Sequence, residues 1–132
     1  MDNERILSKI SELEKYIGEL NQILPGSEAE YITSTKNRRA TERILQISIE
    51  CILDICAIMV RELKVGPPSD EDDLLSLLSE IITSIEKIKQ MKSFRNLLVH
   101  QYGKIDNQLV YKIALEDSSD FQLFIDEIKK LL

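Results

Sequence analysis

Residues 44–65, ILQISIECILDICAIMVRELKV, decide the fold of this chain. Their apolar side chains fall on more than one side of a helix, whereas a helix that is buried on one face needs only every third or fourth position to be apolar. The isoleucines do not alternate with polar residues and the run is far longer than a strand, so a helix is favoured over a β-strand. We expect a central helix that is buried in its own bundle, and a contact with a second subunit stays open.

The segment before this helix predicts two more helical stretches. Residues 4–21 carry apolar side chains at helical spacing, and the Leu-Pro-Gly turn at 24–26 ends that pattern. Ser27, followed by acids in the first turn, is placed to cap a second stretch, which we expect to bend around residues 33–36 before it reaches the central helix.

The segment after it predicts the remaining helices. The Gly-Pro-Pro turn at 66–68 ends the central helix, and Ser69 is expected to cap a helix whose first turn holds four consecutive acids. Thr83 and Glu86 fit a capping box, so the next helix is expected to start at residue 84 and to run to about Tyr102, where Gly103 ends it.

The last part of the chain, from residue 106 or 107 onward, predicts a short helix to about residue 115 and a final one from residue 117 or 118. A strand over residues 110–113 is the less favoured alternative. Together these segments predict an all-α fold: an up-and-down four-helix bundle with an additional short C-terminal helix, formed by residues 1–132 as a single domain.

Composition excludes several classes of protein. Hydrophobic residues make up 43% and charged residues 30% of the chain, and no apolar run reaches the roughly 20 residues that span a bilayer. The first ten residues lack the apolar core of a signal peptide, so a cytoplasmic protein without membrane contact is expected. The two cysteines, Cys51 and Cys56, match no zinc spacing and are assigned to the core.

The charge balance is uneven along the chain. The net charge is −6, yet residues 87–104 contain five basic residues and no acid, and residues 36–43 hold a second basic cluster. A solvated helix face is one interpretation of such runs, and a surface that follows a phosphate backbone is the other.

One group of polar residues can carry chemistry. His100 is the only histidine, and histidine is the side chain that ordinarily exchanges a proton near neutral pH. It lies in FRNLLVHQY, residues 94–102, with Arg95, Asn96 and Tyr102. At about 100° per residue, Asn96 and His100 share one face of a helix and Arg95 and Tyr102 share the neighbouring stripe.

This set suits a phosphodiester. Arg95 can bind two nonbridging phosphate oxygens, while His100 can take the proton from an attacking 2′-hydroxyl of RNA. The scheme needs no metal and no cofactor. Since acid–base cleavage uses a base and an acid, a twofold dimer that joins two copies of the motif would supply both. Spacing alone favours an ordinary helix end, where Arg95 and Tyr102 make salt bridges and hydrogen bonds and His100 is partly buried.

The surrounding residues narrow the choice. MKSFRNLLVHQYGKID, residues 91–106, resembles the signature of the HepT-like branch of the HEPN superfamily, Arg-x4-His-x-Tyr, with matches at Arg95, His100 and Tyr102 and with Asn96 after the arginine. The resemblance extends to RRATERILQISIECILDICAIMV, residues 38–60, to the acidic turn after it, and to the order of elements up to the C-terminus.

The resemblance implies a HEPN-like homodimeric bundle that acts as a metal-independent endoribonuclease toxin, with Arg95 and His100 catalytic and Asn96 supporting. It also implies a minimal nucleotidyltransferase (MNT) antitoxin that inactivates the toxin by transferring AMP to Tyr102. Lys92 and Lys104 become candidate contacts to RNA phosphates. Two alternatives stay open: a non-catalytic HEPN module that binds a nucleotide or docks the nucleotidyltransferase, and a purely structural bundle.

Overall fold

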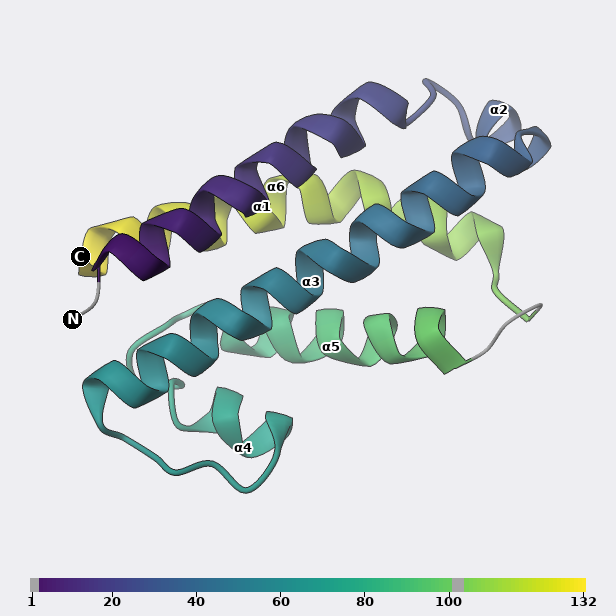
Figure 1. Cartoon of the computed structure of the whole chain (residues 1–132). Helices are drawn as coiled ribbons and strands as arrows, with labels where there is room; N and C mark the ends of the chain where they lie inside the picture. Colours follow the sequence, from purple (N-terminus) through teal and green to yellow (C-terminus); the bar gives the residue numbers. More distant parts are fainter. Residues whose placement is uncertain (1–2, 101–103) are drawn as a thin grey trace.

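The protein is a helical bundle in which the four long helices alternate in direction (Figure 1). The computed structural model describes residues 3–100 and 104–132, and these residues form the helices α1 (Asn3–Ile23), α2 (Glu28–Thr33), α3 (Thr35–Leu63), α4 (Glu71–Ser76), α5 (Ile85–His100) and α6 (Asn107–Leu131). The short helices α2 and α4 lie in the connections on either side of α3. The predicted all-α, up-and-down bundle is confirmed, and no helix in the described part of the chain is long and apolar enough to cross a bilayer.

Helix α3 is the centre of the bundle, as the apolar pattern predicted. It contacts all of the other helices and buries most of its circumference. Its cysteines are free and buried, and burial raises the pKa of Cys51 to about 11 and that of Cys56 to about 12, so neither thiol is a nucleophile at neutral pH. From α1, one stripe of aliphatic side chains packs on the core: Ile6, Ile10, Leu13, Ile17 and Leu20.

The segment before α3 contains a break instead of the predicted bend. Ser27 caps α2, as predicted, by accepting a hydrogen bond from the Glu30 amide at 3.2 Å. Ser34 then ends α2 in extended backbone and begins α3, because its hydroxyl accepts a hydrogen bond from the Asn37 amide at 3.2 Å. Ser34 is therefore the C-cap of α2 and the N-cap of α3, and it is the one residue between the two helices.

The end of α3 also differs in detail from the prediction. Lys64, with φ of 56°, is the C-cap residue in the left-handed conformation, whereas the sequence placed the end of the helix at the Gly-Pro-Pro turn. Gly66 is needed for a steric reason: a Cβ at this position would lie 2.9 Å from a methyl carbon of Val60, so only glycine lets the turn lie this close to α3.

The caps of α4 and α5 come from residues other than those predicted. Asp70, not Ser69, caps α4 by accepting a hydrogen bond from the Asp73 amide at 2.7 Å. At the start of α5, the Thr83 amide donates to Glu127 of α6 in place of Glu86, and Ser84 donates to the same carboxylate at 2.9 Å. A tertiary contact therefore does the work that we assigned to a local capping box.

The C-terminal segment is one continuous helix, so the predicted division at residues 116–119 is wrong. The helix α6 begins at Asn107, within the expected range, and Asp106 caps it. The polar run contains no glycine or proline, and the buried stripe continues through Asp117 into Phe121, so packing favours an unbroken helix. The strand alternative at 110–113 is likewise excluded, since these residues are helical.

Candidate functional site

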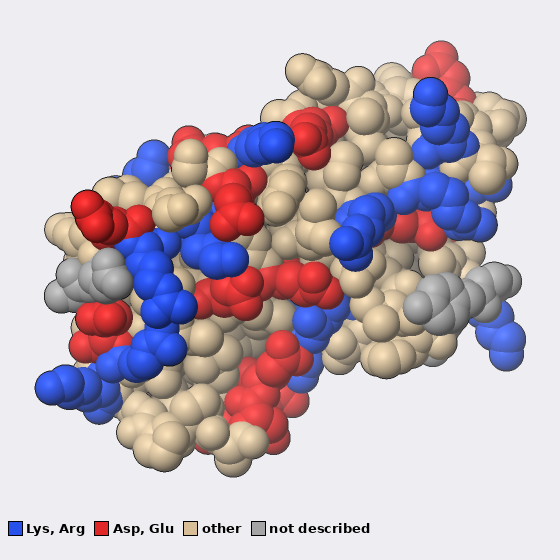
Figure 2. All heavy atoms as spheres, viewed as in Figure 1, with Lys and Arg blue, Asp and Glu red and all other residues tan. Residues whose placement is uncertain are grey.

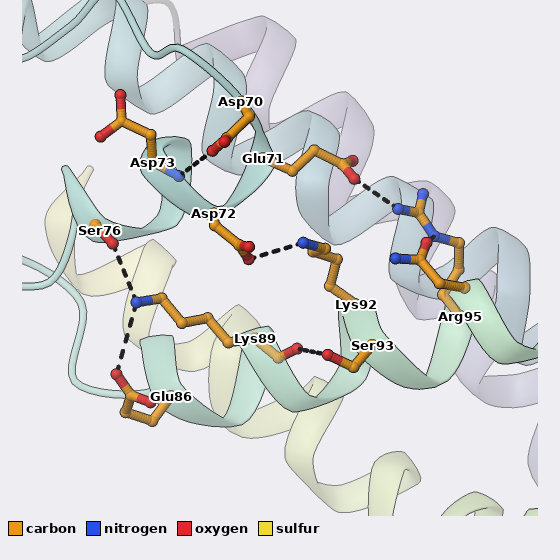
Figure 3. Close-up of polar contacts among 11 residues, drawn as sticks. Asp70, Glu71, Asp72, Asp73, Ser76, Glu86, Lys89, Lys92, Ser93 and Arg95 are labelled. Atoms are coloured by element: carbon orange, nitrogen blue, oxygen red, sulfur yellow. Dashed lines mark hydrogen bonds and ion pairs between the residues drawn. The ribbon is translucent and has the colours of Figure 1, made fainter.

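Helix α5 carries the motif, and its two sides have different environments. The apolar side is buried against the bundle through Ile85, Ile88, Met91, Phe94 and Leu98. The basic side chains of its middle turns, in contrast, meet the short helix α4 (Figure 3). The bundle therefore fixes the position of α5, and α4 provides partners for Lys89, Lys92 and Arg95.

Arg95 is held by two neighbours. Its Nη2 lies 2.7 Å from Oε1 of Glu71 in the first turn of α4, and its Nε donates to Oδ1 of Asn96 at 3.1 Å (Figure 3). The Arg95 side chain is only 14% exposed, whereas that of Glu71 is 45% exposed. An arginine that is largely shielded from water and hydrogen-bonded in this way has few conformations open to it.

Two lysines of α5 are also tied to α4. Lys92 pairs with Asp72 at 2.7 Å and is 14% exposed, and Lys89 donates to the Ser76 hydroxyl at 3.0 Å. The hydrogen bond from Lys92 is the main cause that holds the pKa of Asp72 below its ordinary value. The positive charges of Lys92 and Lys89 lower this pKa further. The basic run of α5 is therefore largely paired with acids, and Figure 2 shows acidic and basic side chains interspersed over this face of the molecule.

His100 is the last residue of α5 and its side chain is exposed. At about 100° per residue, His100 and Arg95 point roughly 140° apart around the helix, so one copy of α5 does not direct both side chains at the same point. Asn96 lies with Arg95 through their hydrogen bond. Tyr102 lies outside the described residues, while Lys104 is exposed at the start of the segment that leads into α6.

An apolar groove of about 160 Å³ lies beside the motif. Leu97 lines it from α5 and Leu109 from α6, each 41% exposed, and Lys104 stands at its edge. No group of three or more histidine, cysteine, aspartate or glutamate side chains among the described residues could hold a metal ion.

A second cavity, of about 90 Å³, lies between α5 and α6. It is lined by Asp117, whose side chain is buried and whose Oδ2 has no hydrogen-bond partner within the described part of the chain. Burial, and then the nearby Asp120 and Glu116, raise the pKa of Asp117 to about 7, although Lys87 opposes this shift.

Sequence reasoning missed the roles of Glu71 and Asp117. The four-acid run at 70–73 was visible in the sequence, but it was interpreted as a favourable charge at a helix N-terminus, and nothing in its spacing indicates a contact with Arg95 some 24 positions later. Asp117 was assigned to a linker, where a carboxylate needs no explanation.

Comparison with known proteins identifies relatives along nearly the whole chain. A family model described as "Ribonuclease HepT-like" matches residues 13–128. An "mRNA nuclease HepT" from Shewanella oneidensis is 27% identical over 131 residues, covering 96% of this chain and 98% of the relative. A "tRNA nuclease HepT" from Aphanizomenon flos-aquae is 25% identical over 131 residues, covering 96% of this chain and 89% of the relative.

Solved structures agree with the sequence relatives. A tri-AMPylated Shewanella oneidensis HEPN toxin in complex with an MNT antitoxin is 26% identical, with a TM-score of 0.86, and the match covers 95% of this chain and 96% of that one. YutE from Bacillus subtilis, at 22% identity and a TM-score of 0.82, is similar in fold.

Proposed function

The chain is a ribonuclease that belongs to the HepT-like family, and we propose that it is the toxin of a HEPN/MNT toxin–antitoxin system that cuts RNA in the cytoplasm without a metal ion. The observation that carries this proposal is the match of the family model over residues 13–128, which contains Arg95, Asn96 and His100 on the last turns of α5. The nuclease relatives and the toxin–antitoxin structure support it.

The proposed reaction uses the RNA's own 2′-hydroxyl. An imidazole nitrogen of His100 takes the proton, and the 2′-oxygen forms a bond to phosphorus as the bond from phosphorus to the 5′-oxygen breaks. The leaving oxygen receives a proton from an imidazolium, and a 2′,3′-cyclic phosphate remains. Arg95 stabilises the charge that grows on the nonbridging oxygens, and Lys92 and Lys104 are the proposed contacts to flanking phosphates.

A homodimer completes this site. One chain has a single histidine, and its Arg95 and His100 point in different directions from α5. In a twofold dimer the arginine of one copy can face the histidine of the other, and two histidines can act as base and acid. The exposed Leu97, which lies between Arg95 and His100 along the chain, supports contact with a second copy through the adjoining groove.

The same site explains inactivation by an antitoxin. A minimal nucleotidyltransferase would transfer AMP from ATP to the phenol oxygen of Tyr102, with pyrophosphate as the leaving group. The tri-AMPylated Shewanella toxin in its antitoxin complex supports this proposal. An AMP group two residues from His100 would bring its own phosphate to the position meant for RNA, so the modified protein should not cleave.

The decisive experiment is cleavage of labelled single-stranded RNA in excess EDTA by the parent protein and by His100→Ala prepared identically. We expect cleavage by the parent, and a loss of about 10³-fold or more in the variant because no other residue can replace the base. Equal cleavage by the two proteins would show that His100 is not the base, and loss of the parent's activity in EDTA would show that a metal is required.

The sample's modification state is the essential control, because AMP on Tyr102 would silence an active enzyme. Intact-mass measurement detects AMP, and Tyr102→Phe provides a chain that cannot accept it. If unmodified protein cuts no RNA, including total cellular RNA, the proposed activity is wrong.

A further inference from the structure

Two of the three nitrogens of the Arg95 guanidinium group are hydrogen-bonded. A guanidinium offers five N–H donors in a fixed plane. Nε donates to Asn96 at 3.1 Å and Nη2 donates to Glu71 at 2.7 Å, while Nη1 has no hydrogen-bond partner among the described residues. Nη1 is therefore the nitrogen that is left to donate to a phosphate oxygen.

We propose that Glu71 is a positioning residue for the RNA-cleaving reaction: together with Asn96 it holds Nε and Nη2 of Arg95, so that Nη1 meets the scissile phosphate. This inference rests on the proposed ribonuclease function. Glu71 touches neither the substrate nor the reacting atoms. It acts through Arg95, by fixing the orientation of the guanidinium before RNA arrives.

The other three acids of the run have different partners, which makes the role specific to Glu71. Asp70 caps α4, Asp73 accepts hydrogen bonds from Ser69, and Asp72 pairs with Lys92. Among these four carboxylates, Glu71 is the one that contacts Arg95 (Figure 3).

The attachment of α4 gives Glu71 a fixed position. Leu74 and Leu75 of α4 are buried, and the Lys92–Asp72 and Lys89–Ser76 contacts join the same two helices on the C-terminal side of Glu71. The acceptor for Arg95 therefore belongs to a turn that is itself packed, which is what positioning a long and flexible side chain requires.

Two opposing electrostatic effects make the proposal testable. The Glu71 carboxylate orders Arg95, and its negative charge also repels an incoming phosphate. Glutamine keeps an oxygen acceptor of the same reach and removes the charge, whereas alanine removes both. If Glu71 positions Arg95, kcat should stay high in the variant that keeps an oxygen acceptor and fall in the variant that loses it. KM for RNA should fall in each variant that loses the negative charge.

The experiment measures kcat and KM for RNA cleavage by Glu71→Gln, by Glu71→Ala and by the parent under steady-state conditions. Glu71→Ala should lower kcat by about 10- to 100-fold, the range expected for a misoriented catalytic group. Glu71→Gln should rescue most of kcat and should lower KM, since the repelling charge is gone. The matched control is Asp72→Ala, which removes an α4–α5 ion pair from the same turn but leaves both contacts of Arg95 in place. It should keep the parent's kcat and lower KM for RNA, because Lys92 is freed from its carboxylate partner.

A second readout does not depend on catalysis. The Nε–H and Nη–H signals of Arg95 in ¹⁵N NMR should be sharp and shifted in the parent, should broaden in Glu71→Ala, and should stay in place in Asp72→Ala. Titration with inorganic phosphate should move the Nη signals more strongly in the parent than in Glu71→Ala.

Each outcome decides the question. An unchanged or raised kcat in Glu71→Ala would overturn the proposal and make Glu71 a competitor of the substrate, and an equal loss in Asp72→Ala would assign the effect to the attachment of α4. If the parent protein cuts no RNA, the proposed function fails, and the NMR signals of Arg95 still decide whether Glu71 orients it.

Discussion

The contact between α1 and α3 and the contact between α4 and α5 are built from different chemistry. Five buried aliphatic side chains of α1 pack against the bundle, whereas α4 combines two buried leucines with hydrogen bonds and ion pairs to Lys89, Lys92 and Arg95. Apolar burial stabilises strongly but has no preferred direction, while a hydrogen bond fixes direction and adds little net stability. The first contact sets where the helices lie, and the second sets where charged side chains point.

A charge in the apolar region should have the largest effect. Ile52 of α3 is 0% exposed, and Ile52→Asp would bury a carboxylate without a partner. We expect the free energy of unfolding to fall by at least about 4 kcal/mol, with loss of cooperative unfolding in urea followed by circular dichroism. The control is Ala57→Asp, at an exposed position of the same helix. Equal stability of the two variants would mean that the core tolerates a charge, and it would contradict the view that apolar burial holds this region together.

Asp117 is an exception inside an apolar contact, and its removal should have an intermediate effect. Its pKa in the folded protein, about 7, lies above the roughly 3.9 of an unfolded chain, so the folded state binds the proton more tightly. The contribution of this residue to stability is therefore highest at acidic pH and falls as pH rises from about 4 to about 7.

Asp117→Asn removes this titration. Relative to the parent, the variant should gain roughly 2 kcal/mol in free energy of unfolding between pH 5 and pH 8, measured by urea unfolding at each pH. The neighbouring Glu116, Asp120 and Lys87 are present in both proteins, so their effect on the pH dependence of stability largely cancels in the difference. Parallel pH profiles for parent and variant would show that Asp117 is ionised in the fold at little cost.

The smallest effect is expected in the polar region. Asp72 is exposed, and pairs of exposed charges contribute little because water and salt screen them. Asp72→Asn should shift the urea midpoint least of the three variants. The pKa of Asp72 is lowered in the fold, so its small contribution exists above the ordinary range of aspartate and is lost as pH falls through the lowered value. A midpoint shift as large as that of Asp117→Asn would contradict this ranking.

The sequence predicted what depends on local pattern. The sequence pattern predicted the buried face of α1, the central position of α3, the Ser27 cap and the start of α6. It also placed Arg95, Asn96 and His100 at the end of α5. The family was also indicated by the motif, and the comparisons confirm it.

What the sequence did not predict depends on contacts between segments far apart in the chain. Glu127 replaces Glu86 at the start of α5 because the fold brings α6 next to it, and Glu71 reaches Arg95 because the turn after α3 folds α4 back onto α5. The α6 segment stayed helical through residues 116–119 because packing on both sides outweighed the weak helix preference of its polar residues.

The single, exposed histidine gives the protein a built-in spectroscopic reporter. Because the chain contains one imidazole, a proton spectrum of untagged protein should show one pair of ring C–H resonances per protomer, which belong to His100 without any assignment experiment. The resonances of this one residue could then report the binding of RNA and the attachment of AMP at Tyr102 in solution. An asymmetric dimer would show two pairs of resonances in place of one.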